Sequence, residues 1–176
     1  RLLSALPGSA SVLEADEIRE GQRQVNLSES LQRIPGFTAL DRQNYAQDLQ
    51  IQSRGFGARS TFGIRGIRLI VDGIPASAAD GQAQAAAFPL SSLDRIEVLR
   101  GPLAMQYGNA AGGVILGISE LDDAPGVSAE AWAGSDGSRR AAVGIDGSQE
   151  AWRWRASASA LATDGARPHS AARRNQ

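Results

Sequence analysis

The spacing of apolar positions changes near residue 120. Before that point, short segments with strand-like alternation mix with short segments of helical spacing. After Pro125, three segments alternate between apolar and polar residues with a period of two. We therefore expect two domains: an α+β domain with a small mixed β-sheet and short helices over residues 1–120, and antiparallel β-strands over residues 121–176.

Two short helices are expected near the start of the chain. One turn covers residues 16–20. A better helix starts at Asn26, where Glu29 completes a capping-box pattern, and ends at Pro35-Gly36. Its apolar side is formed by residues at i, i+4 and i+7: Leu27, Leu31 and Ile34.

The other elements of the first domain follow from alternation and turn residues. Strands are expected over residues 9–13, 49–53, 67–71, 95–99 and 114–118. Asp72-Gly73 predicts a tight turn, and a one-turn helix is expected between Pro102 and Gly108. A glycine-rich loop covers 55–66, and a polar, alanine-rich excursion covers 76–87.

The clearest alternation of the second domain lies in residues 152–160. Trp152, Trp154 and the alanines that follow share one face, while arginines and serines share the other. Transmembrane β-barrel strands have this pattern, and so do water-soluble antiparallel sheets. The three segments are expected to be joined by Asp-Gly turns at residues 136–137 and 146–147.

The composition of the chain limits the kinds of binding and catalytic site that it can form. The 18 basic residues are all arginine, 19 acidic residues balance them, and no block of like charge occurs, which argues against a nucleic-acid binder. The sequence contains no cysteine and one histidine, His169. Neither thiolate metal sites nor a Ser-His-Asp triad is favoured, and the single Met105 gives no copper-binding cluster. We expect no enzyme, no cofactor and no metal site.

Targeting patterns in the sequence do not decide the cellular compartment of the protein. No signal-peptide pattern opens the chain, and no stretch of 18 apolar residues occurs. Either the protein is cytosolic or a signal peptide lies upstream.

Six segments of the first domain, taken together and in order, resemble the successive signatures of the plug of TonB-dependent receptors. The last two are highly specific in combination, because three residues separate them. The resemblance runs from residue 6 to residue 118 and is carried by SASVLEADEI (9–18), LQRIPG (31–36), SRGFG (53–57), LIVDGIP (69–75), RIEVLRGP (95–102) and QYGNAAGGVI (106–115).

The resemblance implies that residues 1–120 are a plug and that residues 121–176 start a transmembrane β-barrel, truncated here. In that family the plug fills a barrel of roughly twenty-two strands in the outer membrane of Gram-negative bacteria. The implied function is uptake of a scarce ligand, foremost an iron-siderophore complex, powered by TonB through an N-terminal box that is not present in this chain. Ligand binding then shifts the population of the released box. The partners implied are TonB, the rest of the barrel, the ligand and the outer membrane.

The resemblance also assigns residue roles. Arg54 and Arg100 match plug arginines that pair with barrel-wall glutamates; the alternative is that they stabilise the plug's own loops. Three loops, over 41–47, 57–63 and 77–84, are expected to point outward and meet ligand. Their candidate binding residues, which could equally be solvated loop residues, are Arg42, Tyr45, Arg59, Ser60, Asp80, Gln82 and Gln84.

Other functions stay open at this point. The same fold could bind cobalamin, a metal or a sugar, or serve signalling. A stand-alone periplasmic binding module with a plug-like fold is a second alternative, and an enzyme is a third. Three strands cannot close a barrel, so we expect a fragment whose residues beyond 125 associate or stay disordered in isolation.

Overall fold

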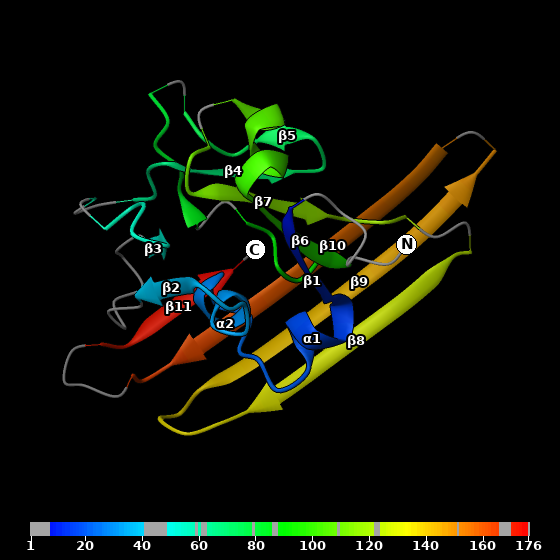
Figure 1. Cartoon of the computed structure of the whole chain (residues 1–176). Helices are drawn as coiled ribbons and strands as arrows, with labels where there is room; N and C mark the ends of the chain where they lie inside the picture. Colours follow the sequence, from blue (N-terminus) through cyan, green and yellow to red (C-terminus); the bar gives the residue numbers. More distant parts are fainter. Residues whose placement is uncertain are drawn as a thin grey trace. The chain divides into compact units, whose positions relative to one another are not determined.

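Two β-sheets dominate the chain, one in each of two compact units. The computed structural model describes residues 8–40, 49–58, 60, 63–78, 80–85, 88–108, 110–121, 124–150, 152–165 and 170–175. The first unit comprises residues 1–42 and 46–119, and the second comprises residues 43–45 and 120–176. Figure 1 labels the helices and strands of both units.

The first unit is built on a five-stranded mixed sheet with the order β1-β6-β7-β4-β5. β4 and β7 pair in parallel, and the other pairs are antiparallel. The mixed sheet expected from the sequence is therefore confirmed. The strands are β1 (Ser9–Glu14), β4 (Ile67–Val71), β5 (Ile74–Pro75), β6 (Arg95–Arg100) and β7 (Gly113–Ile118).

The turn between β4 and β5 forms as predicted. Asp72 and Gly73 both have positive φ, at 48° and 81°, as a type I′ hairpin turn requires. The Asp72 carboxylate also accepts hydrogen bonds from Ser119, from its backbone N–H at 2.7 Å and its hydroxyl at 2.5 Å. The turn is thereby fastened to the chain just after β7.

The helices are α1 (Ala15–Arg19) and α2 (Ser28–Leu31). Leu27, Leu31 and Ile34 are buried, as their spacing predicted. The start of α2 differs from the expected capping box. Glu29 accepts hydrogen bonds from the backbone N–H groups of Gln24 and Val25, at 3.0 and 3.3 Å, both of which precede Asn26.

The core of the first unit lies between the sheet and these helices. It contains Ile18, Leu31, Leu69, Ile96 and Ile115, all exposed by 1% or less. The short helix η3 (Gly101–Tyr107) connects β6 to β7, with Pro102 near its start and Gly108 just beyond its end, as predicted.

Two strands of the first unit, β2 and β5, were not predicted. β2 (Phe37–Leu40) pairs antiparallel with β3 (Gln50–Ser53) in a separate two-stranded sheet. Phe37 and Ala39 are buried and Thr38 and Leu40 are exposed, so β2 has the usual alternation of a half-buried strand.

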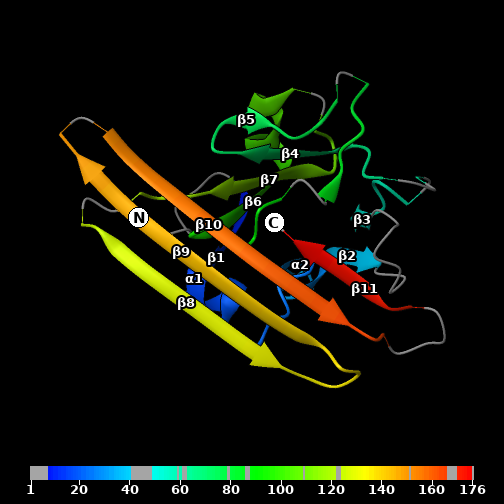
Figure 2. The same cartoon turned by 180° about the vertical axis from the view of Figure 1, so that it is seen from behind.

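The second unit is an antiparallel sheet with the order β11-β10-β9-β8. Figures 1 and 2 show its long strands from opposite sides. The antiparallel strands expected after residue 120 are confirmed, with one more than predicted. They are β8 (Gly126–Ala133), β9 (Arg139–Gln149), β10 (Trp152–Thr163) and the unexpected β11 (Ala172–Asn175).

The turn predicted at residues 146–147 is wrong. Both residues lie inside β9, where Gly147 is paired with Trp154 on β10. A side chain on Gly147 would collide with the Trp154 indole, whose Nε1 lies 2.8 Å from the position of a Cβ. The glycine thus makes room for the ring, and the chain reverses at Glu150, which has a positive φ of 53°.

In the part of the chain that the structure describes, no helix has the length and apolar character needed to cross a membrane.

Candidate functional site

Two of the loops expected to meet ligand are joined to each other. The backbone N–H of Ile64 donates to the carbonyl of Ala83 at 3.0 Å, and the N–H of Ala83 donates to the carbonyl of Ile64 at 2.9 Å. Gln82 packs so closely on Gly63 that a Cβ there would lie 2.8 Å from its amide nitrogen. The loops around residues 60 and 80 therefore form one cluster.

The polar side chains of this cluster differ in their exposure and in their hydrogen bonds. Ser60 is only 9% exposed, and its hydroxyl donates to the carbonyl of Gly63 at 3.2 Å. Asp80 is exposed and accepts a hydrogen bond from the N–H of Gln82 at 3.0 Å. Gln82 is partly exposed and Gln84 is exposed. The other three candidates, Arg42, Tyr45 and Arg59, lie outside the described residues.

Arg100, at the end of β6, is buried. Its guanidinium donates to the carbonyl of Pro35 and, at 2.8 Å, to the hydroxyl of Ser11, and it lies 5.9 Å from the centroid of the Phe37 ring. The Nε–H has no hydrogen-bond partner. Burial, and to a smaller extent the charge of Arg54, lowers the pKa of Arg100. An arginine nevertheless keeps its charge in a protein.

Arg54 stands beside this buried charge. It is exposed, its backbone has a positive φ of 48°, and its N–H donates to the carbonyl of Gly36 at 3.4 Å. A Cβ on Gly36 would lie 3.5 Å from Nη1 of Arg100 and 3.8 Å from Nε of Arg54. The Pro35-Gly36 turn thus brings two guanidinium groups together.

The two arginines lack a negative partner within the described structure, where neither forms an ion pair with a carboxylate. Two like charges, one of them desolvated, create a site that a carboxylate can occupy with charge-assisted hydrogen bonds. Sequence reasoning identified both arginines but missed Ser11, Pro35 and Phe37, which hold Arg100. The segment containing Pro35 was recognisable, but nothing in it indicated contact with residue 100.

The second unit presents two unlike faces. On one face the alternating apolar residues of β8, β9 and β10 lie directly opposite each other, as in the series Ala129, Val143 and Ala158. Large side chains on this face are exposed, including Val127 at 82% and Trp152 at 79%. In water such a surface is unfavourable, because apolar area exposed to water costs about 25 cal/mol per Å².

The opposite face is polar and paired. The Arg155 guanidinium contacts Asp146 at 2.5 Å, and that of Arg140 contacts Glu130 at 3.2 Å. Arg140 is buried, at 6% exposure. These two ion pairs therefore lie on the face away from the exposed apolar residues.

Across the described ranges, no three His, Cys, Asp or Glu side chains lie close enough to hold a metal ion.

Comparisons with known proteins give the context for these surfaces. The ferrienterobactin receptor of Escherichia coli is 33% identical over 124 residues, which is 62% of this chain and 16% of the receptor. The ferric enterobactin receptor PirA of Pseudomonas aeruginosa is 33% identical over 128 residues, covering 64% of the chain and 16% of the receptor. The chain therefore spans about a sixth of the length of these relatives.

Solved structures agree. The siderophore receptor PirA from Pseudomonas aeruginosa superposes with a TM-score of 0.61 and 31% identity, over 91% of this chain and 29% of that one. The copper transporter OprC shares the fold, with a TM-score of 0.68 and 22% identity, over 88% of this chain and 24% of that one. These relatives are receptors and transporters, and one further match is a ferripyoverdine receptor of the outer membrane.

The outer-membrane localisation expected from the sequence is confirmed by these relatives. The model of the TonB-dependent Receptor Plug Domain family matches residues 3–114, the region that holds both arginines, the paired loops and the five-stranded sheet up to the start of β7. The chain belongs to the TonB-dependent receptor plug domain family.

Proposed function

We propose that this chain is the plug and the first barrel strands of an outer-membrane transporter that takes up an iron-siderophore complex with energy supplied through TonB. Residues 1–120 form the gate and ligand sensor, and residues 121–176 form strands of the barrel wall. The observation that supports this most is the 31–33% identity with ferric enterobactin and siderophore receptors over 62–91% of this chain.

The two faces of the second unit support the barrel assignment. Strands of a transmembrane barrel place apolar side chains toward lipid and polar side chains toward the lumen. The sheet has an exposed apolar face and an ion-paired polar face. A sheet folded for water would be expected to bury its apolar side.

Arg54 and Arg100 act in this proposal as the lock between plug and barrel. Their paired positive charges would accept a carboxylate from the barrel wall, and the contact would hold the plug until TonB pulls. The unpartnered Nε–H of Arg100 supports this role, because a donor left without a partner in a buried place costs about 1–3 kcal/mol.

Ligand sensing is assigned to the joined loops. Asp80, Gln82 and Gln84 offer hydrogen bonds from one loop, while Ser60 holds the other loop in place through Gly63. Arg42, Tyr45 and Arg59 complete the proposed set. Arginine side chains would favour an anionic iron chelate.

Growth on defined iron sources tests the transport function. The gene is deleted from the bacterium that carries it, and the deletion strain is grown with one ferric siderophore at a time as its iron source. We expect growth to fail on at least one ferric siderophore and to return with the intact gene. Unchanged growth on every siderophore, together with lost growth on cobalamin or on another ligand, would contradict the iron assignment.

Loop variants test the ligand-sensing residues in the whole receptor. Replacing Arg42 and Arg59 by alanine should weaken siderophore binding by at least about tenfold, since hydrogen bonds to charged groups contribute about 1.5–3 kcal/mol. Arg33→Ala, an exposed arginine outside these loops, is the control and should bind normally. Equal affinity in all three proteins would remove these arginines from the site.

A further inference from the structure

The apolar face of the second unit ends in two arginines. On β9 every second residue, from Ile145 through Val143 and Ala141, points to this face, and the next in line is Arg139. Arg139 is paired with Ala162 on β10, and Ala162 is paired with Arg173 on β11. The register therefore places two arginines on the apolar face, on either side of an alanine.

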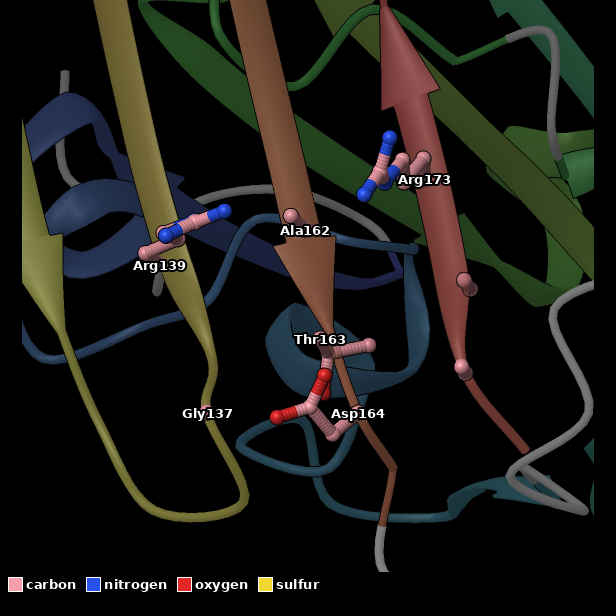
Figure 3. Close-up of a pocket in the computed structure, with 8 residues that line it drawn as sticks. Gly137, Arg139, Ala162, Thr163, Asp164 and Arg173 are labelled. Carbon is pink, nitrogen blue, oxygen red and sulfur yellow. The ribbon is translucent and has the colours of Figure 1, made fainter. Parts of the chain in front are cut away.

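Figure 3 shows these arginines flanking Ala162. They line a cavity of about 460 Å³, together with Gly137, Thr163, Asp164, Ala171 and Ala172. Strands lie about 4.8 Å apart, so the two backbones that carry the arginines are about 10 Å from each other, and long side chains from both can reach one group between them.

The charges at this place are not balanced. Both arginines are exposed, and within the described structure neither forms an ion pair. Among the described residues that line the cavity, the one acid is Asp164, whose carboxylate packs over Gly137 so closely that a side chain there would collide with it. Two positive groups thus face one negative group, and the cavity favours an anion.

The connections between strands orient the site in a membrane. β9 and β10 are joined through residues 150 and 151, at the end that carries Trp152. Longer connections, 134–138 and 164–171, lie at the arginine end. Outer-membrane barrels have short periplasmic turns and long extracellular loops. The tryptophans then lie at the periplasmic interface, and Arg139 and Arg173 lie at the external one.

We propose that Arg139 and Arg173 bind the phosphate of an anionic lipid headgroup in the outer leaflet of the membrane. The proposal rests on the membrane assignment made above. The guanidinium fork suits phosphate oxygens, and the apolar residues of β9 and β10 below it would contact the acyl chains of the same lipid. A lipid of this kind would use both the charges and the apolar surface beside them.

Vesicle flotation tests this proposal with the whole chain. Binding is measured to vesicles of phosphatidylcholine alone and to vesicles that also contain phosphatidic acid. The double variant Arg139→Gln/Arg173→Gln is compared with Arg153→Gln/Arg174→Gln, which removes the same charge from the opposite face. Circular dichroism confirms that each variant keeps its strands.

We expect the intact chain to prefer the vesicles that contain phosphatidic acid. The Arg139 and Arg173 variant should lose about 20- to 30-fold of its affinity for them, because each arginine near an anionic membrane surface contributes about 1 kcal/mol. Its binding to phosphatidylcholine should not change. The control pair should keep the preference, and inorganic phosphate should not abolish it.

Three results would overturn the proposal. An equal loss in both double variants would indicate general charge attraction, and full competition by inorganic phosphate would indicate a site for the free anion. Unchanged binding of the Arg139 and Arg173 variant would remove these residues from any site. Failure of the intact chain to bind even phosphatidylcholine would instead overturn the membrane assignment, and this proposal with it.

Discussion

Strands of both units alternate apolar and polar residues, but the apolar residues are buried in the first unit and exposed in the second. In the first unit, apolar strand residues such as Ile96 and Ile115 are fully buried. In the second, Ile145 on β9 and Val127 on β8 are exposed by 47% and 82%. Alternation therefore gives each strand one apolar and one polar face. The surroundings of the strand decide whether the apolar face is buried or exposed. The first unit buries its apolar strand residues, and the second leaves them exposed, as the proposed lipid-facing role requires.

The same substitution in each unit gives the largest expected difference. Ile96→Ala should destabilise the first unit by about 2–5 kcal/mol, because it leaves a cavity in a packed core. Ile145→Ala should cost less than about 1 kcal/mol in detergent, since its side chain is half exposed. Hydrogen exchange of the β6 and β9 amides measures both. Equal losses would mean that the second unit is packed like the first.

A charge introduced on the apolar face of the second unit should have a larger effect than one introduced on its polar face. Val143 lies in the middle of that face, so Val143→Arg should lower partition into phosphatidylcholine vesicles by about 2–4 kcal/mol. Ser157→Arg, on the polar face of β10, is the control and should leave partition unchanged. Equal effects at both positions would mean that the sheet has no preferred lipid side.

Arg54 tests the lock from within the plug. Because its charge repels the buried charge of Arg100, Arg54→Gln should stabilise the first unit of the isolated chain by about 0.5 kcal/mol, an effect that high salt removes. Arg33→Gln is the matched control and should change little. In the whole receptor the sign should reverse, with weaker plug retention. Destabilisation of the isolated chain would indicate that Arg54 serves the plug's own loop.

Glu29 gives the smallest expected effect. Burial raises its pKa above the ordinary value of 4.5, although backbone hydrogen bonds partly oppose this. The contribution of Glu29 to stability is then fully present below about pH 4.5 and is lost as the pH rises through its raised pKa. In urea unfolding, the free energy of unfolding of the intact chain should therefore exceed that of the Glu29→Gln variant by more at low pH than at neutral pH. The opposite trend would mean that its hydrogen bonds outweigh its burial.

Local patterns predicted elements that depend on local geometry. The spacing of Leu27, Leu31 and Ile34 gave the buried side around α2, and Asp72-Gly73 gave the β4–β5 turn. In each case a residue's neighbours in sequence are sufficient to determine its conformation.

Elements that depend on distant partners were missed. β2 follows a Pro-Gly turn and exists through its pairing with β3, and the arginine-rich β11 exists through its pairing with β10. Gly147 after Asp146 has the sequence of a turn, yet the Trp154 ring on the next strand determines its role. The site shows the same limit: motifs identified Arg54 and Arg100, but the contacts of Arg100 with Ser11 and Pro35 arise from the tertiary fold.

The tryptophans offer the most direct test of the lipid-facing sheet. Trp154 lies on the apolar face and Trp132 on the polar face, paired with Arg140. Two single-tryptophan chains, one retaining Trp154 and one retaining Trp132, with phenylalanine at the other positions, are placed in vesicles of brominated phosphatidylcholine. We predict strong quenching of Trp154 fluorescence and weak quenching of Trp132. Equal quenching of both, or none of either, would contradict the account.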